Sequence, residues 1–204
     1  FTEQFKYLGS LISLEINEDA EIASCINKAK SIMGFLCHFF NCWDVDLRTK
    51  YNIYVSCPLN ALLWGCETWN LSAKNLKKLE AFHHGAARRI LNIQWQQVRE
   101  EKIRNKQVRF RFCNVPKVET FILRRTAKYL GKVARLNERS YPKKFLGAWM
   151  NQPKKNGGVQ LSCNDTFAKA ISAILPQKKN LSSQCLFRDW IPEAKDEPSW
   201  STKI

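Results

Sequence analysis

Hydrophobic residues recur at steps of three and four positions along most of this chain, the spacing that gathers them on one face of an α-helix. One such run extends from Ile22 to Phe40, a second follows Asp46, and a third follows Ser72. Asp and Ser are favoured at helix N-termini, where their side-chain oxygens accept hydrogen bonds from free backbone N–H groups. The pattern therefore predicts a mainly α-helical protein, with helices beginning after Asp46 and after Ser72.

Both ends of the chain depart from this pattern. From Phe5 to Ser13, aromatic and aliphatic residues surround Gly9, a composition typical of a short hairpin or a bent strand. Residues 154–158 are typical of a linker, and a helix over Asn164 to Leu175 and a Trp-containing tail follow it. The predicted fold class is therefore mainly α, with a short N-terminal β-hairpin and a small helical C-terminal appendage.

Trp64 and Trp69 flank a segment with a glycine that interrupts the helical spacing, and we interpret this segment as a packed turn. Tryptophan rings can stack on nucleic-acid bases. The neighbours of these two rings include Leu62, Leu63 and Cys66, which favours packing in the core for both of them.

The formal net charge of +15 lies almost entirely in the middle of the chain. Residues 1–75 have a net charge of −2, residues 76–155 have +16, and residues 156–204 have +1. Charge that serves solubility would be spread evenly, whereas a surface that faces phosphate groups concentrates it. The distribution therefore favours a nucleic acid as the partner.

Two groups of cations in this middle stretch recur at helical steps, and we predict that each group shares one helix face. The first group is Arg99, Lys102, Lys106 and Arg109. The second group, after Pro116, is Arg125, Lys128, Lys132, Arg135 and Arg139. The second helix also has an apolar stripe, expected to pack on the core, made of Ile122, Tyr129, Val133 and Leu136.

Motifs of the common catalytic classes are missing from the sequence. It has no adjacent Asp-Asp pair of the kind that holds Mg²⁺ in polymerases, no phosphate-binding loop, no nucleophile elbow and no H-E-x-x-H helix. The eight cysteines form no C-x-x-C pair, and we interpret them as buried, reduced thiols. We expect no catalysis by this segment alone, and no metal or cofactor in it.

Neither a membrane span nor a secretory leader is apparent. The longest apolar runs are far shorter than the roughly 20 residues that a membrane helix needs. No basic and then apolar leader opens the chain, so an intracellular location, nuclear or cytoplasmic, is expected, with no membrane partner. The chain begins at Phe1 within a strand-like pattern and without an initiator Met, which suggests a fragment of a longer polypeptide.

Several sequence blocks form an ordered set along the chain. They are Phe5–Ser10 (FKYLGS), Leu62–Trp69 (LLWGCETW), Leu79–His83 (LEAFH), Arg88–Ile93 (RRILNI) and Tyr129–Arg135 (YLGKVAR). In this order they resemble the C-terminal part of the reverse transcriptases of non-LTR (LINE-type) retrotransposons, and the resemblance covers nearly the whole chain. Two features of that family are missing: its catalytic Asp-Asp motif would lie upstream of Phe1, and its downstream Cys/His knuckle is absent.

The resemblance implies a domain organisation and a function. It implies a primer-grip-like hairpin at residues 1–16, a helical thumb-like domain at 17–95, a basic helical region at 96–155 and a C-terminal appendage at 156–204. In the family, the hairpin grips the primer end and the thumb follows it, so thumb helices here would contact the backbone of a template–primer duplex of RNA, DNA or both. The fingers–palm domain of the same polypeptide would be a partner, and Mg²⁺ would belong to that domain.

The expected nucleic-acid-binding residues therefore include Lys6 and Tyr7 of the hairpin, by resemblance, and the two cationic groups. Arg88 and Arg89 precede the apolar Ile90 and Leu91, and a phosphate contact and ordinary surface charge explain them equally well. Two alternatives stay open. The chain could be a stand-alone nucleic-acid-binding remnant of a degraded element, or a helical protein–protein interaction domain whose basic face meets an acidic partner.

Overall fold

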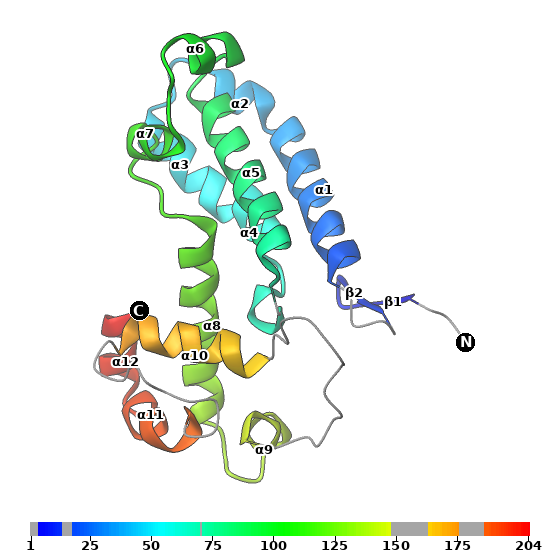
Figure 1. Ribbon diagram of the computed structural model, residues 1–204, viewed down its shortest axis with the longest axis vertical. Coiled ribbons are helices and arrows are strands. Elements are labelled where there is room, and N and C mark those ends of the chain that lie inside the picture. The colour runs from blue at the N-terminus through cyan, green and yellow to red at the C-terminus, as the bar shows by residue number, and fades with distance from the viewer. Residues whose placement is uncertain (1–3, 14–17, 70, 148–162, 176–185) are drawn as a thin grey trace. The chain divides into compact units, whose positions relative to one another are not determined.

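The computed structural model describes residues 4–13, 18–69, 71–147, 163–175 and 186–204 (Figure 1). Over these residues the protein is mainly helical, with a two-stranded antiparallel hairpin near its N-terminus, which confirms the predicted fold class. The chain divides into two compact units. Unit 1 comprises Phe1–Gly65 and Ser72–Glu119, and unit 2 comprises Cys66–Leu71 and Thr120–Ile204.

The predicted hairpin is present in unit 1. Strand β1 (Gln4–Tyr7) pairs with strand β2 (Ser10–Ser13) in the register that places Tyr7 opposite Ser10. Leu8 and Gly9 form the two-residue turn, with φ angles of 48° and 89°. Positive φ at both central residues gives a type I′ turn, whose twist matches the twist of the flanking strands.

Helix α1 (Asp19–Phe35) places Ile22, Cys25, Ala29 and Met33 in the core, as the spacing predicts. The predicted continuation of one helix to Phe40 is wrong, because the chain breaks at Leu36 and a short helix, α2 (Cys37–Asn41), begins after it. Phe40 is nevertheless buried, since the break keeps its side chain on the core side.

Helices α3 (Leu47–Ser56) and α4 (Pro58–Leu62) follow, and α4 packs on α1. The Asp46 carboxylate accepts a hydrogen bond from the Thr49 N–H at 2.9 Å, which confirms the predicted helix start. Pro58 begins a new helix and does not bend the previous one. Proline has no N–H to donate and restricts the residue before it, but it is well tolerated in the first turn of a helix.

Helix α5 (Ala73–Ile90) begins at the predicted cap, where the Ser72 hydroxyl accepts a hydrogen bond from the Asn75 N–H at 3.2 Å. Its apolar face is buried and packs on α1 and on α7 (Asn105–Arg111). The buried apolar residues of α5 are Leu79, Ala86, Ala87 and Ile90.

Trp64, between α4 and the short 3-10 helix η1 (Cys66–Thr68), is half exposed, so the predicted core position is wrong for this ring. It packs on the hairpin instead: its indole N–H donates to the Leu8 carbonyl at 3.3 Å, and Gly9 lies against its ring. Trp69 is buried in unit 2, as predicted.

Unit 2 is built from helix α8 (Val118–Ala134), which belongs to it from Thr120 on, and from the four helices after it. These are α9 (Tyr141–Gly147), α10 (Cys163–Ile174), α11 (Leu186–Lys195) and α12 (Glu197–Lys203). Its core consists of Leu130, Ala134, Ile171, Leu175, Trp190, Ala194 and Trp200. The two tryptophan rings stack with centroids 5.7 Å apart.

The boundaries between the two units differ from the domain boundaries after residues 95 and 155 that the resemblance implies. Most of α8 belongs with the C-terminal helices, since Leu130 and Ala134 share a core with Trp190 and Trp200. The predicted linker at residues 154–158 lies outside the described residues.

The six cysteines whose side chains are described are free thiols. Cys25 and Cys66 are buried as predicted, and burial raises the pKa of Cys25 to about 11 and that of Cys66 to about 12. The prediction of burial is wrong for Cys57, which is exposed at the junction of α3 and α4.

Candidate nucleic-acid interfaces

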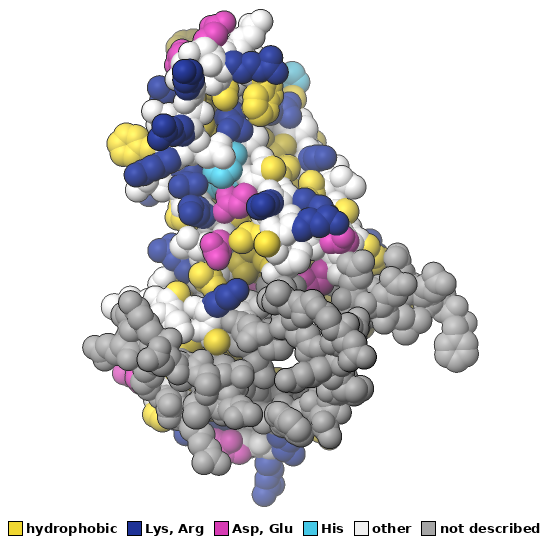
Figure 2. All heavy atoms as spheres, in the orientation of Figure 1, with side chains coloured by type: hydrophobic (Ala, Val, Ile, Leu, Met, Phe, Trp, Pro, Cys, Tyr) yellow, Lys and Arg dark blue, Asp and Glu magenta, His cyan; other side chains and the backbone are white. Residues whose placement is uncertain are grey.

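A basic surface of unit 1, which we call the α6–α7 face, lies on the end of α5, on α6 (Trp95–Glu100), on α7 and on the segments beside them. Figure 2 shows Lys and Arg side chains over these helices. From Arg88 to Lys117 the chain has nine cations and two acidic residues, Glu100 and Glu101, and within the described part none of the nine forms an ion pair. The nine are Arg88, Arg89, Arg99, Lys102, Arg104, Lys106, Arg109, Arg111 and Lys117.

The predicted single helix face of the first cationic group is wrong, because the chain turns between α6 and α7. Lys102 has a left-handed backbone, with φ 49°, and the Ile103 N–H donates to the Val98 carbonyl at 3.2 Å. This pattern terminates a helix in a Schellman-type cap. The turn is stabilised further because the Ile103 side chain is buried.

Both short helices also have an N-terminal cap of their own. The Gln94 N–H donates to the Gln97 side chain at 2.9 Å, and the Arg104 N–H donates to the Gln107 side chain at 2.7 Å. The first cationic group is thereby distributed over α6, the turn and α7: Arg99 lies on α6, Lys102 in the turn, and Lys106 and Arg109 on α7. All but Arg109 are exposed.

Arg88 connects the three helices of this face. Its guanidinium lies over the Trp95 ring, 5.1 Å from the centroid, and donates to the side-chain oxygen of Asn105, the first residue of α7. A guanidinium over an indole is attracted by the negative face of the ring. Arg88 is therefore half-buried and positions its neighbours, whereas Arg89 beside it is exposed.

Arg109 is held by the second contact between α5 and α7. Its Nη1 donates to Nε2 of His84 at 3.3 Å, and the Nδ1 of the same ring lies 3.7 Å from the Glu80 carboxylate. Because a guanidinium only donates, Nε2 must accept and the ring proton belongs on Nδ1. Burial, followed by the charges of Arg109 and Arg88, lowers the pKa of His84, so at neutral pH the ring is uncharged.

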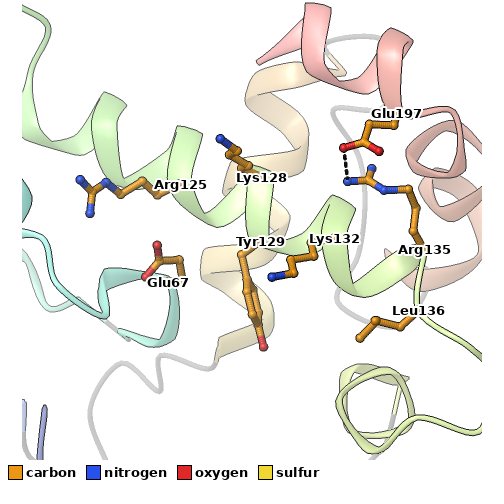
Figure 3. A pocket seen from close by; sticks show the side chains of 8 residues that line it. All are labelled: Glu67, Arg125, Lys128, Tyr129, Lys132, Arg135, Leu136 and Glu197. Carbon is orange, nitrogen blue, oxygen red and sulfur yellow. Dashed lines mark hydrogen bonds and ion pairs between the residues drawn. The ribbon is translucent and has the colours of Figure 1, made fainter. Parts of the chain in front are cut away.

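The second basic surface lies in unit 2, where four members of the second cationic group line an open pocket of about 610 Å³, which we call the α8 pocket (Figure 3). The predicted alignment is confirmed for these four residues. The pocket is completed by Tyr129 and Leu136 and by one carboxylate each from η1 and α12, Glu67 and Glu197. The four cations are Arg125, Lys128, Lys132 and Arg135.

Arg139 does not belong to this surface. Helix α8 ends at Ala134, and Arg139 lies in the following turn, where its N–H donates to the Asn137 side chain at 2.9 Å. The predicted apolar stripe is also only half buried: Ile122 and Val133 lie in the core, whereas Tyr129 and Leu136 are 37% and 36% exposed and line the pocket.

The cations of the α8 pocket differ in their contacts with other protein groups. Arg135 donates to the Ala194 carbonyl at 3.0 Å and pairs with Glu197 at 3.4 Å, so it connects the end of α8 to α11 and α12. Lys128 and Lys132 are exposed, and neither forms an ion pair with a described acidic side chain. These two lysines have the charge most available to a ligand.

Lys6 and Tyr7 lie on β1, and both are exposed. The Tyr7 ring stacks on Phe5 with centroids 6.3 Å apart, and more than half of its surface remains accessible. The hairpin is held against helix α1, since Lys28 of α1 donates to the Gly9 carbonyl at 2.8 Å. The two side chains are therefore free to contact a ligand.

Sequence reasoning overlooked two aromatic residues of the α6–α7 face, Trp95 and Phe110, which are 66% and 75% exposed. The signal was present for both rings: polar glutamines flank Trp95 on each side, and arginines flank Phe110. Arg104, Arg111 and Lys117 were overlooked as well, because they fall outside the helical repeat.

Within the described residues, no group of three His, Cys, Asp or Glu side chains is placed to hold a metal ion. No helix in this part of the chain has both the length and the apolar character required to cross a membrane.

Comparison with known proteins gave no match of the chain to a family model, to a curated protein or to a solved structure.

Proposed function

We propose that this chain binds the phosphate backbone of a nucleic acid, as the template–primer-gripping C-terminal part of a retrotransposon-type reverse transcriptase without a polymerase active site of its own. The observation that supports binding best is the stretch from Arg88 to Lys117, which includes the α6–α7 face and in which nine cations lack an acidic partner within the described residues. Unpaired charge of one sign is costly to concentrate, and phosphates would compensate it.

The α8 pocket would supply further backbone contacts, mainly through Lys128 and Lys132. Lysine and arginine contacts to phosphates give affinity and position without reading the base sequence. Each neutralised phosphate releases condensed counterions, so the logarithm of the affinity falls against the logarithm of the salt concentration by about 0.9 per contact. About six contacts would give a slope of roughly −5.

The reverse-transcriptase part of the proposal rests on the ordered resemblance of the sequence blocks. The exposed Lys6 and Tyr7 suit a hairpin that holds the 3′ end of a primer. The partners would be an RNA–DNA or DNA duplex and an upstream fingers–palm domain, which would hold the Mg²⁺ ions. An intracellular location, in the nucleus or the cytoplasm, follows from the same proposal.

The test measures binding of a blunt 20-base-pair duplex to the chain by fluorescence anisotropy, over a range of salt concentrations. The variant K128E/K132E is compared with K30E/K169E, which removes the same formal charge at exposed lysines outside both basic surfaces. If both phosphate contacts exist, the first variant flattens the salt slope by about 1.8, and the control leaves it nearly unchanged.

A third variant, R99E/K106E, tests the α6–α7 face in the same assay. We expect weaker duplex binding and a flatter slope than for K30E/K169E. Equal effects of all three variants would mean that only the overall charge attracts the duplex. Binding of an acidic protein but of neither RNA nor DNA would replace the proposal with a protein-interaction function.

A further inference from the structure

Trp95 is a largely exposed aromatic residue of the α6–α7 face. It begins α6, is 66% exposed, and is contacted on one side by the Arg88 guanidinium. Exposed aromatic rings beside cations are a feature of surfaces that bind single-stranded nucleic acid, where the rings stack on bases. Arg88 is itself fixed by Asn105, so the orientation of the ring is set before any ligand arrives.

Phe110 is the second such ring. It lies on α7, is 75% exposed, and makes no ring contact within the described part of the chain. The opposite side of α7 is in the core, through Val108 and Phe112. Lys106 precedes Phe110 by one helical turn and is also exposed, so a cation and an aromatic ring share the outer side of α7.

Contacts with α5 fix the two helices that carry these rings. Arg88 contacts Trp95 of α6 and Asn105 of α7, and His84, one turn earlier on α5, receives the hydrogen bond of Arg109 from α7. These two anchoring residues are separated by about 6 Å along the axis of α5. The anchors leave the outer sides of α6 and α7 accessible.

Cations alternating with exposed rings match the requirements of one ligand class. A single-stranded nucleic acid offers phosphates to the cations and unpaired bases to the rings, and bases of any sequence can stack on an aromatic ring. The bases of a duplex are stacked inside it and do not reach a ring on a protein surface. A duplex grip by itself would therefore need the lysines and arginines but neither Trp95 nor Phe110.

An exposed tryptophan elsewhere in unit 1 provides the contrast. Trp43 is 89% exposed, but it is followed by Asp44 and Asp46, and the nearest cation in the sequence is Arg48. Phosphates would be repelled at that ring, whereas the α6–α7 face attracts them. Trp95 and Phe110 differ from Trp43 because they combine an exposed ring with neighbouring cations.

We infer that the α6–α7 face binds single-stranded nucleic acid, with bases stacked on Trp95 and Phe110 and phosphates on the surrounding lysines and arginines. The inference rests on the proposed function, which supplies nucleic acid as the ligand. It adds that the bound nucleic acid is single-stranded and that Trp95 and Phe110 contact its bases. In a template–primer complex the strand would be the unpaired part of the nucleic acid.

The test compares a fluorescein-labelled 15-nucleotide oligo(dT) with a blunt 15-base-pair duplex, using the full chain and its variants W95A, F110A and W43A. We expect W95A and F110A each to weaken binding of oligo(dT) about 10-fold while duplex binding changes less than about twofold. W43A should bind both probes as the unmodified chain does. The conservative variants W95F and F110W retain a stacking ring and should retain most of the affinity.

The outcomes separate the inference from the proposed function. If the chain binds both probes and the alanine variants lose less than about twofold on oligo(dT), the stacking inference is wrong and the backbone grip stands. An equal loss on both probes, or a loss that W95F and F110W fail to restore, would also overturn stacking, because the rings would then only support the fold. If the chain binds neither probe, both proposals fail.

Discussion

The indole ring of Trp200 lies directly against Gly131 in the core of unit 2. A Cβ atom added to Gly131 would overlap the indole nitrogen, which donates a hydrogen bond to the Ala127 carbonyl one turn earlier on α8 at 3.1 Å. The missing side chain at Gly131 therefore allows Trp200 of α12 to pack closely against α8.

We expect G131A to destabilise the protein by about 1–3 kcal/mol, because the added methyl group forces the Trp200 ring or the helix to shift. Urea unfolding, followed by far-UV circular dichroism, measures the free energy of unfolding. The matched control is G85A, in helix α5, where an added Cβ meets nothing within 4 Å. That variant should gain up to about 1 kcal/mol from the better helix propensity of alanine. Equal stabilities of the two variants would contradict the tight contact.

A buried histidine makes the stability of unit 1 depend on pH. His83 lies between Tyr54 and the carbonyl of Pro116, at 2.7 Å and 3.1 Å. The carbonyl only accepts, so Nε2 donates to it and Nδ1 accepts from the Tyr54 hydroxyl. Burial, followed by the neighbouring His84, lowers the pKa of His83 to about 4, well below the value of an unfolded chain.

Between pH 4 and about 6.5 the unfolded chain therefore binds more protons than the folded one. The contribution of His83 is fully present above this window, and it is lost as the pH falls through it, by on the order of 3 kcal/mol. Unfolding by urea at pH 7.5, 6 and 4.5 measures the loss. In H83Q we expect lower stability at pH 7.5 and a weaker dependence on pH. A slope in H83Q as steep as that of the unmodified chain would show that other groups cause it.

The described thiols should differ sharply in reactivity. Cys57 is exposed, whereas Cys25 and Cys66 are buried and their pKa values are raised by burial, which suppresses the reactive thiolate. Brief labelling with N-ethylmaleimide at pH 7.5 and peptide mass spectrometry should find Cys57 modified first. Cys25 and Cys66 should react only after denaturant is added. Rapid modification of Cys25 in the native protein would be inconsistent with the core of α1.

The hairpin residues should matter for binding and little for stability. Tyr7 and Lys6 are exposed, so Y7A and K6A should change the free energy of unfolding by less than about 0.5 kcal/mol. Under the proposed function, both variants should weaken binding of a recessed-primer duplex more than binding of a blunt one. The control is G9A, which strains the turn at φ 89° and should lower stability. No preference of the unmodified chain for the recessed primer would argue against a primer grip.

The sequence by itself determined the helical character of the protein and the capped starts of α3 and α5. The caps at Asp46 and Ser72 depend on hydrogen bonds to residues three positions later, and local interactions of this kind are visible in the order of residues. The hairpin and the alignment of the cations from Arg125 to Arg135 could also be predicted from the sequence. Both depend on residues that are close together along the chain. The concentration of basic charge in the middle of the chain is likewise visible in the sequence alone.

Only the tertiary structure decided how these elements are interrupted and combined. The turn at Lys102 forms because Ile103 is buried and α7 then packs on α5, so burial overrides the regular spacing of the cations. Trp64 and Trp69 have similar sequence surroundings, yet one packs on the hairpin and the other is buried in unit 2. The partners of Trp95 are equally non-local, since Arg88 and Asn105 meet only when three helices pack together. A side chain's exposure depends on contacts between distant segments, and the spacing of hydrophobic residues describes only the face of a single helix.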